Sequence, residues 1–133
     1  MVYTEFGRLH VSPQEIVVIP RGIKFSVHLE GESRGYIAEL YKGHLFIPER
    51  GPIGANGLAN ERDFEFPVAW YDKSESNWTI IQKFCGHFFS FEQTFSPFNV
   101  VAWHGNYLPF KYDLNKYCAM NSVTYDHPVR GII

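Results

Sequence analysis

Apolar, β-branched and aromatic residues occur along this chain in short runs that are separated by turn residues. No stretch of about ten residues has the three- and four-residue spacing of an amphipathic helix. Turn signals such as Pro20-Arg21-Gly22 and Glu30-Gly31-Glu32 lie between the runs. We therefore predict strands over residues 15–19, 23–29, 35–41, 43–47, 68–71, 78–84, 88–91, 100–103 and 118–125.

This succession of short strands is typical of an antiparallel β-sandwich or barrel. Residues 13–22 also have the cadence of a cupin-type jelly roll, in which a turn and a buried strand are followed by a Pro-x-Gly turn into the next strand. We predict an all-β, cupin-like jelly roll or β-sandwich. A length of 133 residues allows a single domain that covers residues 1–133.

The segment from Pro48 to Arg62 has no such pattern and is rich in Gly, Pro and Asn. It is too long for an ordinary hairpin connection, and loops of that length are usually functional or packed against a neighbour.

Composition and charge exclude several classes of protein. Aromatic residues make up 17% of the chain, which favours strands and argues against disorder. The net charge is −2 and the basic residues are scattered, so a nucleic-acid partner is not expected. No apolar run approaches the roughly 20 residues of a membrane span, and the start lacks a signal-peptide pattern. We expect a cytoplasmic protein without a membrane partner.

The residues alone offer one local metal-binding candidate, His28-Leu29-Glu30. On a strand, residues two apart project to the same side and could chelate one ion, with His87 or His104 as a distant third ligand. The competing interpretation, which we favour, is that Glu30 begins a turn and faces water. His87 and Glu92 are separated by odd spacing, so a strand would place them on opposite faces.

His104 lies where the apolar run 100–103 ends, a position at which side chains are often held for use. We favour a structural histidine that hydrogen-bonds a buried backbone group. Trp103 and Tyr107 are interpreted as core or interface aromatics in preference to a substrate platform.

Two runs have neither helical nor strand periodicity, so particular backbone and side-chain requirements must fix their order. They are Ser96 to Tyr107 (SPFNVVAWHGNY) and Gly51 to Asn60 (GPIGANGLAN). Both resemble homogentisate 1,2-dioxygenase, the iron-dependent enzyme that opens the aromatic ring of homogentisate during tyrosine breakdown. The resemblance extends over nearly the whole chain through residues 4–7, 18–22, 34–36, 69–71 and 121–127.

The resemblance implies that this chain is an interior section of a longer cupin-like chain, so that its β domain is incomplete. Sizeable segments would belong before Met1 and after His127, and the later one would carry the iron ligands. Fe(II) is therefore the cofactor of the full-length family, and we expect this chain alone to bind no metal tightly.

His127 is the catalytic residue that the resemblance indicates. Residues 121–127 resemble the strand end where the family places an active-site His that interacts with the ring hydroxyl of the substrate and is implicated as a base. An imidazole with a pKa of roughly 6.5 suits the acceptance of a phenolic proton near neutral pH. Residues 128–133 do not resemble the continuation of the family.

The resemblance favours a catalytically incomplete portion of an enzyme. In the family, O₂ cleaves the ring of homogentisate to give maleylacetoacetate in tyrosine and phenylalanine catabolism, and the family is expected to form homo-oligomers. The resemblance implies that the segment from Pro48 to Arg62 packs within such an oligomer, and we favour this over a ligand-gripping loop. One alternative is a non-catalytic assembly module that binds itself or a full-length relative. A third is a small stand-alone cupin with a metal site built from His28, Glu30 and a later His.

Overall fold

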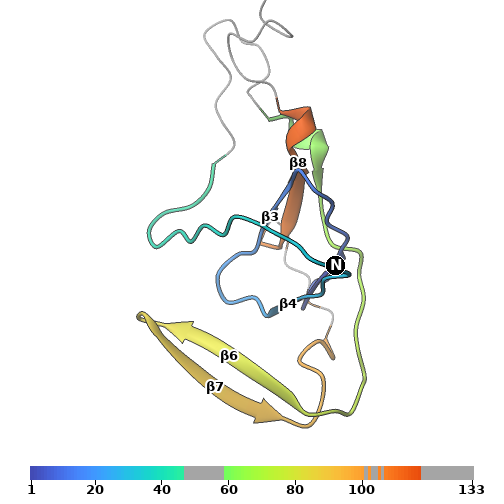
Figure 1. The fold of residues 1–133 in the computed structure, drawn as a ribbon, viewed down its shortest axis with the longest axis vertical. Coiled ribbons are helices and arrows are strands. Elements are labelled where there is room, and N and C mark those ends of the chain that lie inside the picture. Colours follow the sequence, from blue (N-terminus) through green and yellow to red (C-terminus); the bar gives the residue numbers. More distant parts are fainter. Residues whose placement is uncertain (47–58, 101, 103–104, 106, 118–133) are drawn as a thin grey trace, which may run out of the picture.

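The computed structural model describes residues 1–46, 59–100, 102, 105 and 107–117, and within these residues strands form all the regular structure apart from two short 3₁₀ turns (Figure 1). The strands are β1 (Val2–Thr4), β2 (Gly7–Leu9), β3 (Glu15–Val18), β4 (Phe25–Val27), β5 (Phe64–Glu65), β6 (Trp78–Phe84), β7 (His87–Gln93) and β8 (Phe110–Asp113). The 3₁₀ turns are η1 (Glu61–Asp63) and η2 (Leu114–Lys116). The all-β prediction is confirmed, and the antiparallel sheets are consistent with part of a cupin-like β-sandwich.

The first sheet has the strand order β2-β1-β4, and both pairs are antiparallel. The turn between β1 and β2 is held by Thr4, whose hydroxyl donates to the Gly7 carbonyl at 2.9 Å and accepts from the Phe6 N–H at 3.1 Å. Gly7 has a φ of +123°, and a Cβ there would lie 2.0 Å from the Val68 carbonyl oxygen. Only glycine therefore fits this close backbone approach.

The second sheet has the order β3-β8-β5, again antiparallel, and β8 is its central strand. Lys111 and Tyr112 of β8 are buried. The 3₁₀ turn η2 follows β8 directly and is capped by Asp113, whose carboxylate accepts from the Asn115 N–H. A central strand with neighbours on both sides has its backbone groups paired in both directions.

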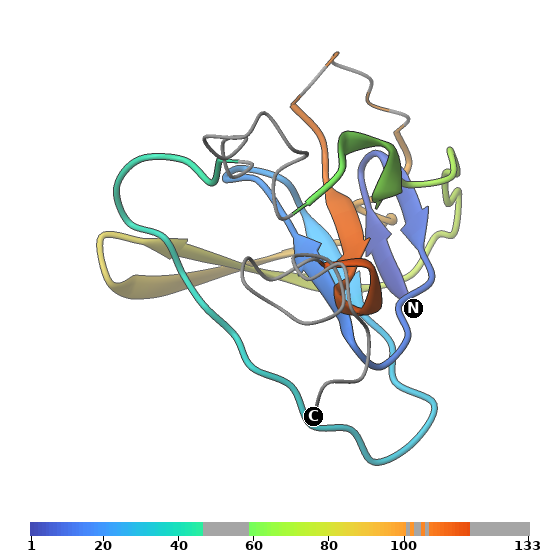
Figure 2. The same ribbon diagram turned by 90° about the horizontal axis from the view of Figure 1, so that it is seen from above.

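The third sheet is the two-stranded β6–β7 hairpin, in which seven residue pairs run from Trp78–Gln93 to Phe84–His87. Its turn consists of Cys85 and Gly86, both with positive φ, which matches the twist of the flanking strands. Figures 1 and 2 show that the hairpin projects as an arm from the rest of the described chain.

The strand predictions are confirmed over β3, β6 and β7 and shortened over β4. Strands predicted within residues 35–46 are wrong, because these residues form no strand and are exposed. Residues 68–71 contribute one isolated bridge, from Val68 to Arg8. Strands β1, β2, β5 and β8 were not predicted. Residues 47–58, 101, 103 and 118–125 lie outside the described part of the chain.

Among the described residues, the buried apolar core is small. It consists of Val2, Phe6, Leu9, Phe98, Leu108 and Tyr112. Many other large apolar side chains are exposed, including Tyr36 at 95% and Ile37 at 94%. No helix among the described residues is long and apolar enough to cross a membrane.

Candidate functional site

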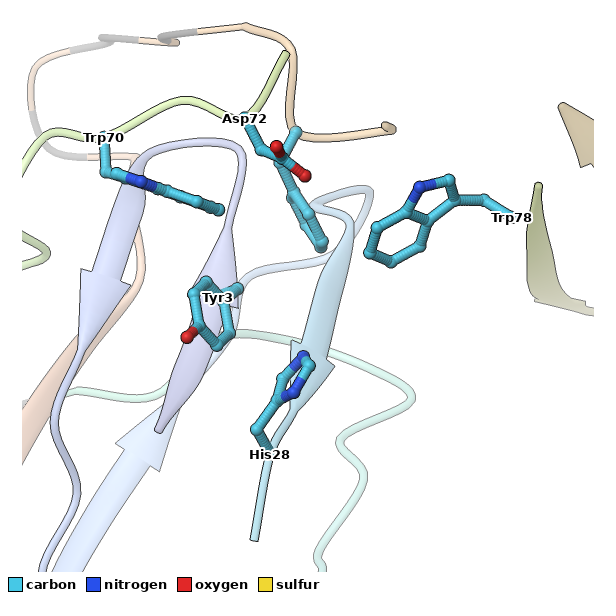
Figure 3. A pocket seen from close by; sticks show the side chains of 6 residues that line it. Tyr3, His28, Trp70, Asp72 and Trp78 are labelled. Carbon is cyan, nitrogen blue, oxygen red and sulfur yellow. The ribbon is translucent and has the colours of Figure 1, made fainter. Parts of the chain in front are cut away.

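A pocket of about 230 Å³ lies where the first sheet meets the base of the β6–β7 hairpin. It is lined mainly by aromatic side chains from segments far apart in the sequence: Tyr3, His28, Trp70, Asp72, Trp78 and Phe98. In Figure 3, Trp78 reaches in from the start of β6, while Tyr3 and His28 come from β1 and the end of β4. The fold thus brings together side chains that are up to 95 positions apart in the sequence, from Tyr3 to Phe98.

The aromatic rings that line the pocket contact one another in series. The ring centroids of Tyr3 and Trp70 are 5.0 Å apart, and those of Trp70 and Phe98 are 6.4 Å apart. Trp78 meets Phe98 edge to face at 5.8 Å. These distances lie in the range in which aromatic pairs attract. On the rim, the Arg8 guanidinium carbon lies 5.1 Å from the centre of the Trp70 ring.

His28 follows directly after β4 and packs edge to face against Tyr3, with ring centroids 4.6 Å apart. Its Nε2 is 3.0 Å from the Ser26 hydroxyl. The metal-binding candidate His28-x-Glu30 required both residues to lie on one strand, and β4 ends at Val27. The structure therefore removes the geometric reason for that pair, and Glu30 is exposed as the competing interpretation predicted.

Asp72 is the acidic side chain of the pocket. Its carboxylate accepts hydrogen bonds from the Ser74 N–H at 2.9 Å and from the Ser74 hydroxyl at 2.7 Å. Hydrogen bonds from the Ser74 side chain, the Ser74 backbone and the Ser96 side chain hold the pKa of Asp72 below its ordinary 3.8. The group is therefore ionised at neutral pH, which does not suit general acid or base chemistry there.

The aromatic lining of the pocket suits contact with an apolar group. The pocket combines a mostly apolar lining with one ionised carboxylate that is already engaged with Ser74. Such a site favours a flat or branched apolar group. We interpret it as a recognition or docking site.

An iron site does not fit the part of the chain that the structure describes. A non-haem iron site needs two His and a carboxylate on one face of the metal. Among the described residues, no group of three or more His, Cys, Asp or Glu side chains could hold a metal ion. His87 and Glu92 both lie on β7, five positions apart, so they point to opposite faces as predicted.

The most buried charged cluster lies on the second sheet and is structural. Lys111 Nζ lies 2.8 Å from Glu15 Oε1 and 3.2 Å from Glu65 Oε2. The side chains of Lys111 and Glu15 are only 11% and 10% exposed. Burial by itself raises the pKa of Glu15, but hydrogen bonds from Lys111 and Ser12 outweigh it and bring that pKa below 4.5. This ion pair joins β3 to β8.

Four more residues were singled out in the sequence, and of these only Tyr107 belongs to the described part of the chain. His127, His104 and Trp103 lie outside the described residues. Tyr107 is 52% exposed, and its hydroxyl donates to the Arg21 carbonyl. It is therefore not a core aromatic, while the interface interpretation stays a prediction.

Of the residues that line the pocket, only His28 was singled out in the sequence, and it was singled out as a candidate metal ligand. Trp70, Asp72 and Trp78 lie within a short stretch, which is a usable local signal for a shared site. Tyr3 and Phe98 join them only through the fold, and no local pattern indicates that contact.

Comparison with known proteins gives a consistent result. Residues 1–114 match the family model described as homogentisate 1,2-dioxygenase N-terminal. The chain is 59% identical over 126 residues to the homogentisate 1,2-dioxygenase of Caenorhabditis elegans, which covers 95% of this chain and 29% of that protein. It is 58% identical over 128 residues to the Arabidopsis thaliana enzyme, covering 95% of this chain and 28% of that one. For the Homo sapiens enzyme the identity is 53% over 129 residues, covering 96% and 29%. The chain thus spans less than a third of the length of these curated relatives.

Proposed function

The chain belongs to the homogentisate 1,2-dioxygenase family, where it matches the N-terminal domain, and on this premise we propose that it supplies the β framework of an enzyme that cleaves the ring of homogentisate. The substrates would be homogentisate and O₂, and the product maleylacetoacetate. The match over residues 1–114 is the observation that carries this proposal. Residues 1–114 would help to build the β framework of the enzyme, and the aromatic pocket on them suits contact with an apolar group.

Fe(II) is proposed for the family's enzyme and not for the described part of this chain. The described residues offer no group of three or more His, Cys, Asp or Glu side chains that could hold it. We also propose that the assembled enzyme is a cytoplasmic homo-oligomer.

His127 is proposed as the residue that accepts a proton from a ring hydroxyl of homogentisate. The proposal is supported by the resemblance of residues 121–127 to the family and by imidazole chemistry near neutral pH. In an assembled enzyme, replacing His127 by Asn is expected to lower kcat about 100-fold or more, a typical loss for a general base. A kcat that is unchanged would remove His127 from the reaction.

The framework role is tested with a chimera. The matched residues of the C. elegans relative are replaced by the corresponding residues of this chain, and the chimera is loaded with Fe(II) and given homogentisate and O₂. We expect oxygen uptake by the chimera and none by this chain alone treated in the same way. A chimera with the circular dichroism and size of the intact relative but without oxygen uptake would overturn the proposed function.

A further inference from the structure

The β6–β7 hairpin has two unlike faces, because directly paired residues of antiparallel strands point to the same side. The pairs on one side are mostly aromatic or aliphatic: Trp78–Gln93, Ile80–Phe91, Gln82–Phe89 and Phe84–His87. The pairs on the other side are mostly polar: Thr79–Glu92, Ile81–Ser90 and Lys83–Phe88. We name the first the apolar face, formed by Trp78, Ile80, Phe84, Phe89 and Phe91, and the second the polar face.

The apolar face is largely open to solvent. Phe84, Phe89 and Phe91 are 58%, 55% and 46% exposed. A two-stranded hairpin is marginally stable in water unless it packs against a further layer. A contiguous aromatic surface of this kind marks an interaction site in a soluble protein. We therefore expect another segment to cover the apolar face of the hairpin.

The polar face is already contacted by another part of the chain. Lys83 forms an ion pair with Glu39, and its ammonium lies 5.4 Å from the centre of the Tyr41 ring. The same ammonium lies 6.0 Å from the centre of the Phe88 ring on β7. These contacts direct a further partner to the opposite side of the hairpin.

The apolar face continues into the aromatic pocket through Trp78. This residue belongs to the face by register and to the pocket by its edge-to-face contact with Phe98. Its indole Nε1 is buried and has no hydrogen-bond acceptor among the described residues. A buried indole N–H usually has a partner. A covering segment would supply an acceptor here together with an apolar group for the pocket.

We propose that the apolar face and the adjoining pocket form the docking surface for the part of a homogentisate dioxygenase chain that lies outside this match. The relatives are long enough for this role, because the matched part is only 29% of the C. elegans protein. A segment of the same polypeptide also docks without the loss of translational freedom that a separate copy would incur. We therefore favour the remainder of the same polypeptide, and not a second copy of it, as the occupant of the docking surface.

The inference rests on the proposed function, and the same chimera tests it with a readout that does not need activity. Photoreactive p-benzoylphenylalanine is placed at Phe89 on the apolar face or, as the matched control, at its neighbour Phe88. Phe88 is 72% exposed but lies on the polar face. The chimera is irradiated, and crosslinked peptides are identified by mass spectrometry.

We expect the probe at position 89 to crosslink to peptides of the relative outside the graft within the same polypeptide, and the probe at position 88 not to do so. Crosslinks from position 89 only within the graft, only to a second polypeptide, or not at all would overturn the docking proposal. An active chimera with such a result leaves the proposed function intact. A folded chimera that crosslinks as expected but takes up no oxygen supports the docking surface and overturns the proposed function.

A second measurement uses stability. Phe89→Asp is expected to lower the Tm of the chimera by several degrees while leaving the Tm of this chain alone unchanged, because only the chimera covers that face. Phe88→Asp is expected to change neither. Equal effects of the two substitutions in the chimera would contradict a one-sided docking surface.

Discussion

The first sheet and the β6–β7 hairpin show that longer strands do not bury their side chains more completely. The first sheet is built from strands of three residues, yet Val2, Thr4 and Leu9 are buried within it. The hairpin has strands of seven residues with a complete pairing register, but its phenylalanines are about half exposed. Backbone pairing alone stabilises a hairpin little. A sheet removes its apolar surface from water only when a second layer of structure packs against it.

The largest expected effect comes from the glycines of the two hairpin turns. Gly7→Ala is expected to cost about 4 kcal/mol, because the new Cβ would meet the Val68 carbonyl at a strained φ. Gly86→Ala is the matched control: its φ is also positive, but nothing lies within 4 Å. It is expected to cost about 1 kcal/mol. Urea unfolding of both variants gives the difference, and equal losses would contradict the close approach at Gly7.

The next effect concerns two lysines, one on the second sheet and one on the hairpin. Lys111→Met is expected to cost about 3 kcal/mol, because it leaves the buried Glu15 carboxylate without its cation. Lys83→Met removes an exposed ion pair with Glu39 and is expected to change stability very little. Thermal unfolding of both variants compares them. If the two lysines proved equally important, the second sheet would be no better buried than the hairpin.

A smaller effect is expected from two threonines. Thr4→Val removes the hydroxyl that serves both the Phe6 N–H and the Gly7 carbonyl, and is expected to cost about 2 kcal/mol. Thr79 lies on the exposed polar face of β6. Thr79→Val is expected to change the free energy of unfolding by less than about 0.5 kcal/mol. Their free energies of unfolding in urea are the measurement. A neutral Thr4→Val would show that the β1–β2 turn does not depend on this side chain.

The smallest effect is a dependence on pH. Because the folded-state pKa of Glu15 lies below 4.5, its contribution to stability is present above pH 4.5 and is lost as the pH falls through the folded-state value. Glu15→Gln should therefore flatten the acid side of the curve of unfolding free energy against pH. An unchanged acid slope in that variant would show that Glu15 is not the group responsible.

The sequence predicts regular, local features of this molecule well and non-local ones poorly. The all-β class and strand β6 follow from apolar and β-branched runs between turn residues. The run around Tyr36 and Ile37 has the same composition but forms no strand, because a strand also needs a partner for its backbone groups, and the chain supplies none among the described residues. Strands of three residues, such as β1, are too short to show a period.

The candidate site likewise depends on contacts between segments that are far apart in the sequence. Trp70 and Trp78 are close in sequence, but Tyr3 and Phe98 join them only because β1 and the segment after β7 meet in the fold. The family resemblance, which was stated for nearly the whole chain, is confirmed, since long irregular runs carry more information than periodic ones. The catalytic role of His127 stays a prediction.

Hydrogen exchange of the chain alone is the most direct measurement of the contrast between the two regions. In the chain alone, we expect amides of β6 and β7 to exchange at least roughly ten times faster than amides of β1. In the chimera, we expect the amides of the hairpin to be as protected from exchange as those of the first sheet. Equal protection of the two regions in the chain alone would contradict the claim that the hairpin depends on a covering segment.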